Sequence, residues 1–86
     1  MYSLATKQKV DKIFDKLSKK NPKQLQIIFK KLEEIVADPY RFKPLRGDMH
    51  GAYRVHIDKS FVLIYEIDEP NKTVVLLDYD HHDKIY

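Results

Sequence analysis

The chain of 86 residues is long enough for one domain, residues 1–86, and 43% of it is hydrophobic, which suffices for a core. It has no cysteine, which excludes a disulfide framework and a thiolate metal site. No signal peptide is evident, and no stretch approaches the roughly 20 apolar residues of a membrane span. We therefore expect a soluble, cytoplasmic protein.

The net charge of +3 is unevenly distributed along the chain. Up to Gly47 there are 12 Lys and Arg residues against 5 Asp and Glu, and after Gly47 there are 4 against 8. The basic half favours a polyanionic partner such as a nucleic acid. A solvated, lysine-rich helix surface would give the same excess, so both interpretations stay open.

The first half of the chain predicts a short strand and two helices. Met1–Ala5 indicates a brief edge strand, and Thr6 is a candidate N-cap for the helix that follows. Asn21 and Pro22 suit the start of a second helix, which ends before Pro39. Almost no linker separates the helices, so we expect an antiparallel hairpin. Apolar residues at helical spacing predict the buried stripes: Val10, Ile13, Phe14 and Leu17 in the first helix, and Leu25, Ile28, Phe29, Leu32, Ile35 and Val36 in the second.

The second half predicts a β-hairpin. Tyr53–Ile57 alternates apolar and polar residues, the period of a half-buried strand, and the polar turn Asp58–Ser60 leads into Phe61–Tyr65. Arg54 and His56 then point out of the same face, two residues apart on a rigid element. Such a face can present a cation and a titratable imidazole to an anionic ligand.

Thr73–Leu77 is apolar on both faces, which indicates a central strand that is covered on both sides. The predicted fold class is α+β. A short N-terminal strand precedes a two-helix antiparallel hairpin, which packs on one face of a three- to four-stranded, largely antiparallel sheet. The other sheet face should carry Arg54 and His56 and receive the C-terminal residues.

Several short motifs follow one another in a distinctive order. A helix pair ends at Asp38-Pro39 and is followed by Leu45-Arg46-Gly47, Tyr53-Arg54-Val55, Leu63-Ile64-Tyr65 and the tail His81–Tyr86. Together they span nearly the whole chain and resemble the RelE/ParE toxin superfamily, in particular its RelE branch of ribosome-dependent mRNA endonucleases. The resemblance implies a RelE-like microbial RNase fold.

The resemblance also implies an activity and partners. Such toxins enter the ribosomal A site and cleave mRNA there by attack of a 2′-hydroxyl on the adjacent phosphate, without a metal or a small-molecule cofactor. A cognate RelB-type antitoxin wraps the toxin and blocks it, and no membrane is involved. The implied catalytic residues are Arg54, His56, His81 and Tyr86, and the implied RNA-binding residues are Arg46, Lys43 and His82.

The chemistry of these side chains suits such roles. Arg54 is permanently charged and binds phosphate with two hydrogen bonds. His56 or His81 can transfer protons near neutral pH. Tyr86 can orient a group, transfer a proton or stack on a base, but it is a poor base unless cations lower its usual pKa of about 10.

The chain departs from the family pattern at Val62, where relatives usually have an arginine. With a three-residue loop, Ile57 pairs with Phe61 and His56 with Val62, which sets an apolar side chain inside the expected phosphate site. Removing one preorganised charge typically costs about 10²–10³ in rate, so we expect a weakened or inactive toxin. A ParE-type poison of DNA gyrase and a non-catalytic, antitoxin-binding homologue stay open as alternatives.

The tail also departs from the pattern. Asp78, Asp80 and Asp83 stand where relatives are often basic. His81, His82 and Asp83 invite a metal interpretation, but adjacent residues of a strand point to opposite faces. We therefore predict no metal site.

Overall fold

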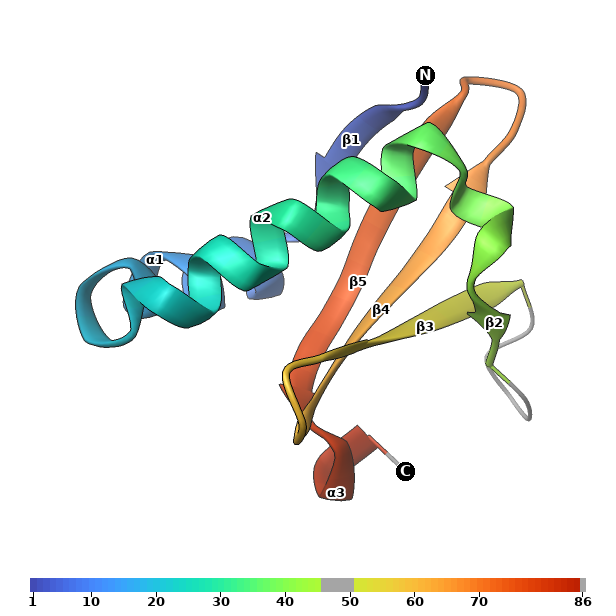
Figure 1. Ribbon diagram of the computed structural model, residues 1–86. Helices are drawn as coiled ribbons and strands as arrows, with labels where there is room; N and C mark the ends of the chain where they lie inside the picture. The colour runs from blue at the N-terminus through green and yellow to red at the C-terminus, as the bar shows by residue number, and fades with distance from the viewer. Residues whose placement is uncertain (46–50, 86) are drawn as a thin grey trace.

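A computed structural model describes residues 1–45 and 51–85, in which two helices lie across one face of a five-stranded sheet (Figure 1). The elements in chain order are β1 (Ser3–Thr6), α1 (Gln8–Lys20), α2 (Pro22–Ala37), a 3-10 helix (Pro39–Arg41), β2 (Lys43–Pro44), β3 (Ala52–Ile57), β4 (Phe61–Asp68), β5 (Thr73–His81) and α3 (His82–Ile85). The strand order is β1-β5-β4-β3-β2, with β1 parallel to β5 and all other pairs antiparallel. The predicted α+β class is confirmed, but the sheet has five strands rather than the predicted three or four, because the short strands β1 and β2 pair at its two edges. No helix within the two described ranges is long and apolar enough to cross a membrane.

The helix boundaries follow local chemistry. The Asn21 side chain accepts a hydrogen bond from the Gln24 backbone N–H at 3.3 Å, as expected of an N-cap that precedes a proline. The α2 helix ends at Ala37, just ahead of Asp38 and Pro39. The predicted N-cap of α1 is wrong: Thr6 belongs to β1, and the cap residue is Lys7, which makes no side-chain capping bond.

The main core lies between the helix pair and the sheet. The two helices bury Val10, Ile28, Leu32 and Ile35 against the sheet. Phe29 departs from the predicted stripe, since it is 50% exposed. The strands contribute Val55 and Ile57 from β3, Leu63 and Tyr65 from β4, and Val74, Leu76 and Tyr79 from β5.

The opposite sheet face has a smaller apolar cluster. Ala52, Val62 and Ile64 are at most 3% exposed there. Leu45, Leu77 and Ile85 pack around them, so the end of α3 helps to cover this face. We call this face the open face, because α1 and α2 pack on the other side.

The β3–β4 register is the predicted one. Ile57 pairs with Phe61 and His56 with Val62, across a turn in which Asp58 has a left-handed φ of 56°. The β4–β5 pair contains an irregularity instead of continuous pairing: Ile64 lies opposite Asp78 while Tyr65 lies opposite Leu76. One residue of β5, Leu77, is therefore extra, which is a β-bulge.

A polar cluster joins the other end of the sheet to the chain before β2. The Glu69 carboxylate accepts a hydrogen bond from the Tyr2 hydroxyl at 2.9 Å and further hydrogen bonds from the Tyr40 hydroxyl and the Lys72 ammonium. These donors, Lys72 foremost, lower the pKa of Glu69 to about 2. The Tyr65 hydroxyl nearby donates to the Pro39 carbonyl oxygen at 2.6 Å, which ties β4 to the 3-10 helix.

Candidate functional site

Arg54 and His56 lie on the open face of β3, as the alternation predicted. Arg54 is flanked by Lys43 of β2 on one side and by Ile64 of β4 on the other, since these residues pair across the sheet. His56 is exposed and pairs with the fully buried Val62. Two cations and an imidazole therefore border the small apolar cluster of the open face.

A hollow of about 290 Å³ opens where β2 stops pairing with β3. The β2 strand covers β3 only at Tyr53 and Arg54, so the β3 edge beyond Arg54 has no strand partner among the described residues. Side chains from the segment that leads into β2 and from β3 meet at the hollow. It is lined by Arg41, Phe42, Lys43, Arg54, Val55 and His56.

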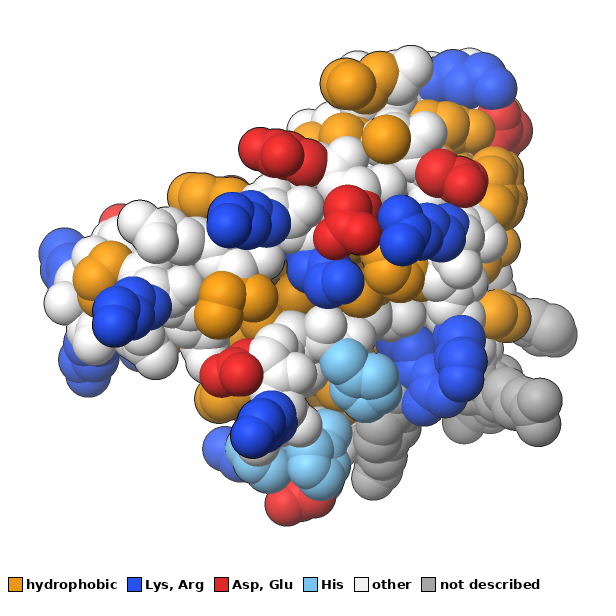
Figure 2. Space-filling model, in the orientation of Figure 1, with side chains coloured by type: hydrophobic (Ala, Val, Ile, Leu, Met, Phe, Trp, Pro, Cys, Tyr) orange, Lys and Arg blue, Asp and Glu red, His pale blue; other side chains and the backbone are white. Residues whose placement is uncertain are grey.

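The hollow is strongly basic. Three cationic side chains line it, those of Arg41, Lys43 and Arg54, and Arg41 Nη1 lies 3.3 Å from Oε1 of Glu34 in α2. The Phe42 ring is approached by the Arg41 guanidinium at 5.7 Å and by the Lys31 ammonium at 5.8 Å, both measured to the ring centroid. Figure 2 shows Lys and Arg side chains beside a histidine on this side of the molecule. Such a surface suits phosphate groups.

Arg41 and Phe42 line the hollow but were not among the residues predicted from the sequence. Their signal was the run Tyr40–Pro44, which combines basic and aromatic residues, the composition of a nucleic-acid contact. The run alone does not show which of its side chains line the hollow, because that depends on where β2 begins to pair with β3. Of the other candidates, Arg46 and Tyr86 lie outside the described residues.

His81 lies on the opposite face of the sheet from Arg54 and His56. His81 pairs with Phe61, whose side chain packs with the helix-side core, and the two rings meet edge to face at 5.6 Å. His81 faces the helix side because of the bulge at Leu77: one extra residue reverses the alternation along the rest of β5. The open face receives Asp80 at that position, next to Val62.

The expectation that His81 and His82 point to opposite faces is wrong. The β5 strand ends at His81 and α3 begins at His82, so strand alternation no longer applies. The two imidazoles stack with centroids 4.7 Å apart and an interplanar angle of 28°. Asp83 lies against both: its carboxylate is 2.9 Å from His82 Nδ1 and 3.5 Å from His81 Nδ1.

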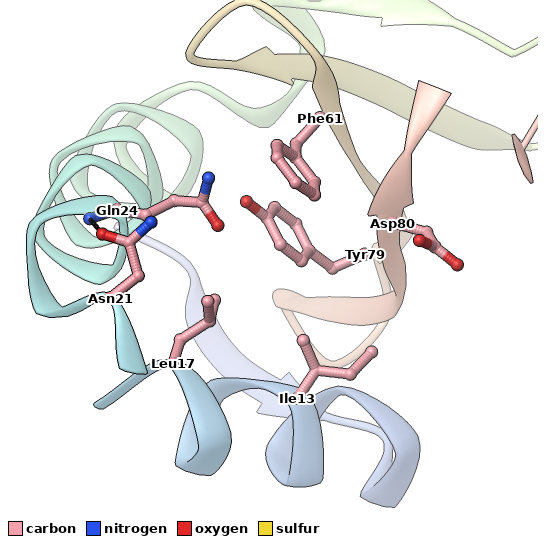
Figure 3. Close-up of a pocket in the computed structure, with 7 residues that line it drawn as sticks. All are labelled: Ile13, Leu17, Asn21, Gln24, Phe61, Tyr79 and Asp80. Carbon is pink, nitrogen blue, oxygen red and sulfur yellow. Dashed lines mark hydrogen bonds between the residues drawn. The ribbon is translucent and has the colours of Figure 1, made fainter. Parts of the chain in front are cut away.

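A second hollow, of about 390 Å³, lies between the helix hairpin and β5 (Figure 3). Apolar side chains dominate its walls, and the buried Tyr79 hydroxyl has no hydrogen-bond partner within residues 1–45 and 51–85. Burial raises the pKa of Tyr79, so its phenol stays neutral. Asp80 points away from the centre of this hollow (Figure 3). We assign no chemistry to it, because none of the described residues that line it is a Lys, Arg or His.

Comparison with known proteins gives a consistent result. Residues 1–86 match the family model described as the ParE toxin of type II toxin–antitoxin systems, parDE. An uncharacterised protein of Methanosarcina mazei is 54% identical over all of both chains. The candidate toxin RelE4 of Methanocaldococcus jannaschii is 51% identical over all of this chain and 92% of its own length. The Mycobacterium tuberculosis toxin–antitoxin complex RelBE2 contains a chain with a TM-score of 0.78 and 26% identity, over 94% of this chain and 98% of its own.

Proposed function

The chain belongs to the RelE/ParE toxin family of type II toxin–antitoxin systems, and on that premise we propose that it is a ribosome-dependent mRNA endoribonuclease of the RelE type. The observation that carries the proposal is the basic hollow: Arg54 and His56 share one strand face, with Lys43 and Arg41 beside them. A gyrase poison needs no such pairing of a proton-transfer group with phosphate-binding cations.

The proposed reaction is a transesterification within the RNA. The 2′-oxygen forms a bond to the adjacent phosphorus as its proton leaves, the bond from phosphorus to the 5′-oxygen breaks, and that oxygen gains a proton. Arg54 stabilises the negative charge that builds up on the phosphoryl oxygens. Lys43 and Arg41 neutralise neighbouring phosphates of the strand.

We assign the proton transfer to His56. An imidazole exchanges protons near neutral pH, and His56 shares the open face with Arg54. His81 is the weaker candidate, because its strand position faces the helix side. Tyr86 is proposed as the second proton-transfer or base-stacking group, and Arg46 and His82 as further RNA contacts. The reaction as written requires no metal or other cofactor.

Regulation by an antitoxin is part of the proposal. The M. tuberculosis relative was crystallised as a toxin–antitoxin complex. We propose that a RelB-type antitoxin binds this chain in the cytoplasm and covers the basic hollow. An acidic segment of the antitoxin would suit the cations that line it.

We further propose that Val62 weakens the activity. Val62 is fully buried beside His56 and occupies a position where the resembled toxins usually carry an arginine. One permanent charge is thereby lost next to the scissile phosphate. The residual cations would support slow cleavage.

The decisive test is primer extension on cellular mRNA after the toxin is induced without antitoxin. We expect growth arrest and new mRNA 5′ ends that map to the ribosomal A site, and we expect both to disappear in Arg54→Ala. Lys30→Ala is the matched control, because it removes an exposed cation from α2 and leaves the hollow intact.

The rival function is inhibition of DNA gyrase, which the description of the matching family model favours. DNA breaks and filamentation with intact mRNA would establish that rival. Normal growth on expression of soluble, folded protein would reject both toxic activities. Antitoxin binding would then be the one remaining function of the three considered.

A further inference from the structure

The junction of β5 and α3 gathers three metal-ligating side chains. His81 ends the strand, and His82 and Asp83 open the short helix. One donor atom from each of the three lies within 4.8 Å of the other two. All three side chains are accessible, with exposed fractions of 38%, 43% and 73% in chain order, so a dissolved ion can reach them.

The spacing of the donors is close to that of a coordination shell. Tetrahedral zinc has bonds of about 2.0–2.1 Å to imidazole nitrogen and carboxylate oxygen, which separates neighbouring ligand atoms by roughly 3.3 Å. The Asp83 carboxylate oxygens lie 2.9 Å from His82 Nδ1 and 3.5 Å from His81 Nδ1. Small side-chain rotations suffice to centre an ion among these atoms.

The contact between His81 and Asp83 favours a cation for a second reason. The Asp83 backbone N–H donates to His81 Nδ1 at 3.3 Å, so this nitrogen presents its lone pair. The same nitrogen lies 3.5 Å from a carboxylate oxygen, which is also an acceptor. A bound cation would replace this contact between two acceptors with two bonds, and the long backbone hydrogen bond would be given up.

We propose that His81, His82 and Asp83 form a binding site for a divalent transition metal of the zinc, nickel, cobalt or copper class. Two imidazoles and one carboxylate are ligands that this class prefers, whereas magnesium and calcium prefer oxygen ligands throughout. Three protein ligands leave the remaining positions to water. The proposed cleavage chemistry needs no metal, and His56, to which the proton transfer is assigned, lies outside this cluster.

The bound metal would fix α3 to the end of the sheet. A four-residue helix is not stable by itself, and α3 is held through Ile85 in the open-face cluster and through the His82 backbone N–H, which donates to the Ser60 carbonyl oxygen at 2.8 Å. A metal that joins the last residue of β5 to the first two of α3 adds a third attachment. Metal binding should therefore raise the thermal midpoint.

The test is calorimetric titration of the untagged, chelator-treated protein with Zn²⁺, followed by Co²⁺ absorption spectroscopy and thermal unfolding. We expect one equivalent of Zn²⁺ to bind, a tetrahedral Co²⁺ spectrum, a thermal midpoint that rises with Zn²⁺ concentration, and no response to Mg²⁺. In His82→Ala and Asp83→Asn the affinity should fall by more than about tenfold.

His56→Ala is the matched control, because it removes another exposed histidine that lies outside the cluster. Its Zn²⁺ affinity should equal that of the parent chain. Circular dichroism verifies that each variant is folded, and Asp83→Asn, which preserves size, decides the matter if His82→Ala unfolds. Absence of Zn²⁺ uptake, unchanged affinity in both cluster variants, or loss of binding in His56→Ala would each overturn the proposal.

Discussion

The two faces of the sheet are built by the same strands, yet they differ in what they bury. Toward the helices, β3 and β4 present Val55, Ile57, Leu63 and Tyr65, each at most 4% exposed and part of one continuous core. On the open face, three buried residues form a small cluster with a few partly buried apolar neighbours, and the polar side chains of Arg54 and His56 lie beside it.

The difference shows how a small domain combines stability with a polar surface. The helix side excludes water over most of its area, so it supplies most of the hydrophobic stabilisation. On the open face, a small apolar cluster suffices to pack α3 against the sheet. Arg54 and His56 can therefore stand beside buried residues without entering the main core. Four predictions test this contrast.

The largest effect should come from the helix side. Leu63→Ala removes a fully buried side chain from the main core and should destabilise the protein within the range of about 2–5 kcal/mol, near its upper end. Ile64→Ala is its counterpart on the open face, where the thinner packing can relax, and should lie near the lower end. Chemical denaturation measures both free energies of unfolding. Equal losses would show that the two faces stabilise the fold alike.

The second effect concerns activity rather than stability. Arg54→Ala should lower mRNA cleavage by about 10²–10³-fold, because it removes the guanidinium that is proposed to stabilise the charge on the phosphoryl oxygens. Arg54→Lys keeps the charge but loses the planar, two-bond geometry, so it should recover only part of the rate. Cleavage rates on programmed ribosomes decide the order of the three proteins. Full activity in Arg54→Ala would remove this residue from the mechanism.

The third effect links the two roles of the open face. Val62→Arg should increase cleavage by about tenfold, part of what one preorganised charge supplies, since a long side chain can carry its guanidinium out of the cluster beside His56. It should also lower stability, because Val62 is fully buried among apolar neighbours. Cleavage rate and denaturation midpoint are measured on the same preparation. A destabilised variant with no faster cleavage would refute the idea that Val62 attenuates the toxin.

The smallest effect concerns Glu69, whose charge is expected to stabilise the fold, whereas the charges of the hollow are expected to act in cleavage. The pKa of Glu69 is lowered to about 2 in the folded chain, against about 4.5 for a free glutamate, chiefly by its hydrogen bond from Lys72. Its contribution to stability is therefore complete above pH 4.5 and is lost as the pH falls toward 2. Glu69→Gln should be less stable than the parent at pH 7 and should match it near pH 2. The same difference at both pH values would contradict this account, and cleavage should not change.

Local patterns predicted much of the fold. Alternation in Tyr53–Ile57 and a short polar turn set the register in which His56 opposes Val62, because strand period and loop length leave few alternatives. Pro39 stopped α2 where expected, since the residue before a proline avoids the helical conformation. The two residues of β2 were too few to show a period.

Other features depended on contacts between distant segments. Counting alternate residues from Leu76 would assign Leu77, Tyr79 and His81 to the open face, but the bulge at Leu77 turns Tyr79 and His81 toward the helices. No local signal marks that position, because the bulge depends on how β5 fits against β4. The stacking of the His81 and His82 rings likewise depends on the end of β5 at His81, where the chain turns into α3.

The sequence by itself determined the order of the two long helices and the three long strands, the hairpin register and the position of Arg54 and His56 on one face, since each depends on spacing along a few residues. Only the tertiary structure decided that Arg41 and Phe42 join Arg54 at one hollow and that His81 leaves it for a cluster of its own. Those outcomes depend on where one strand stops and where another gains a residue, and both are settled by packing across the sheet.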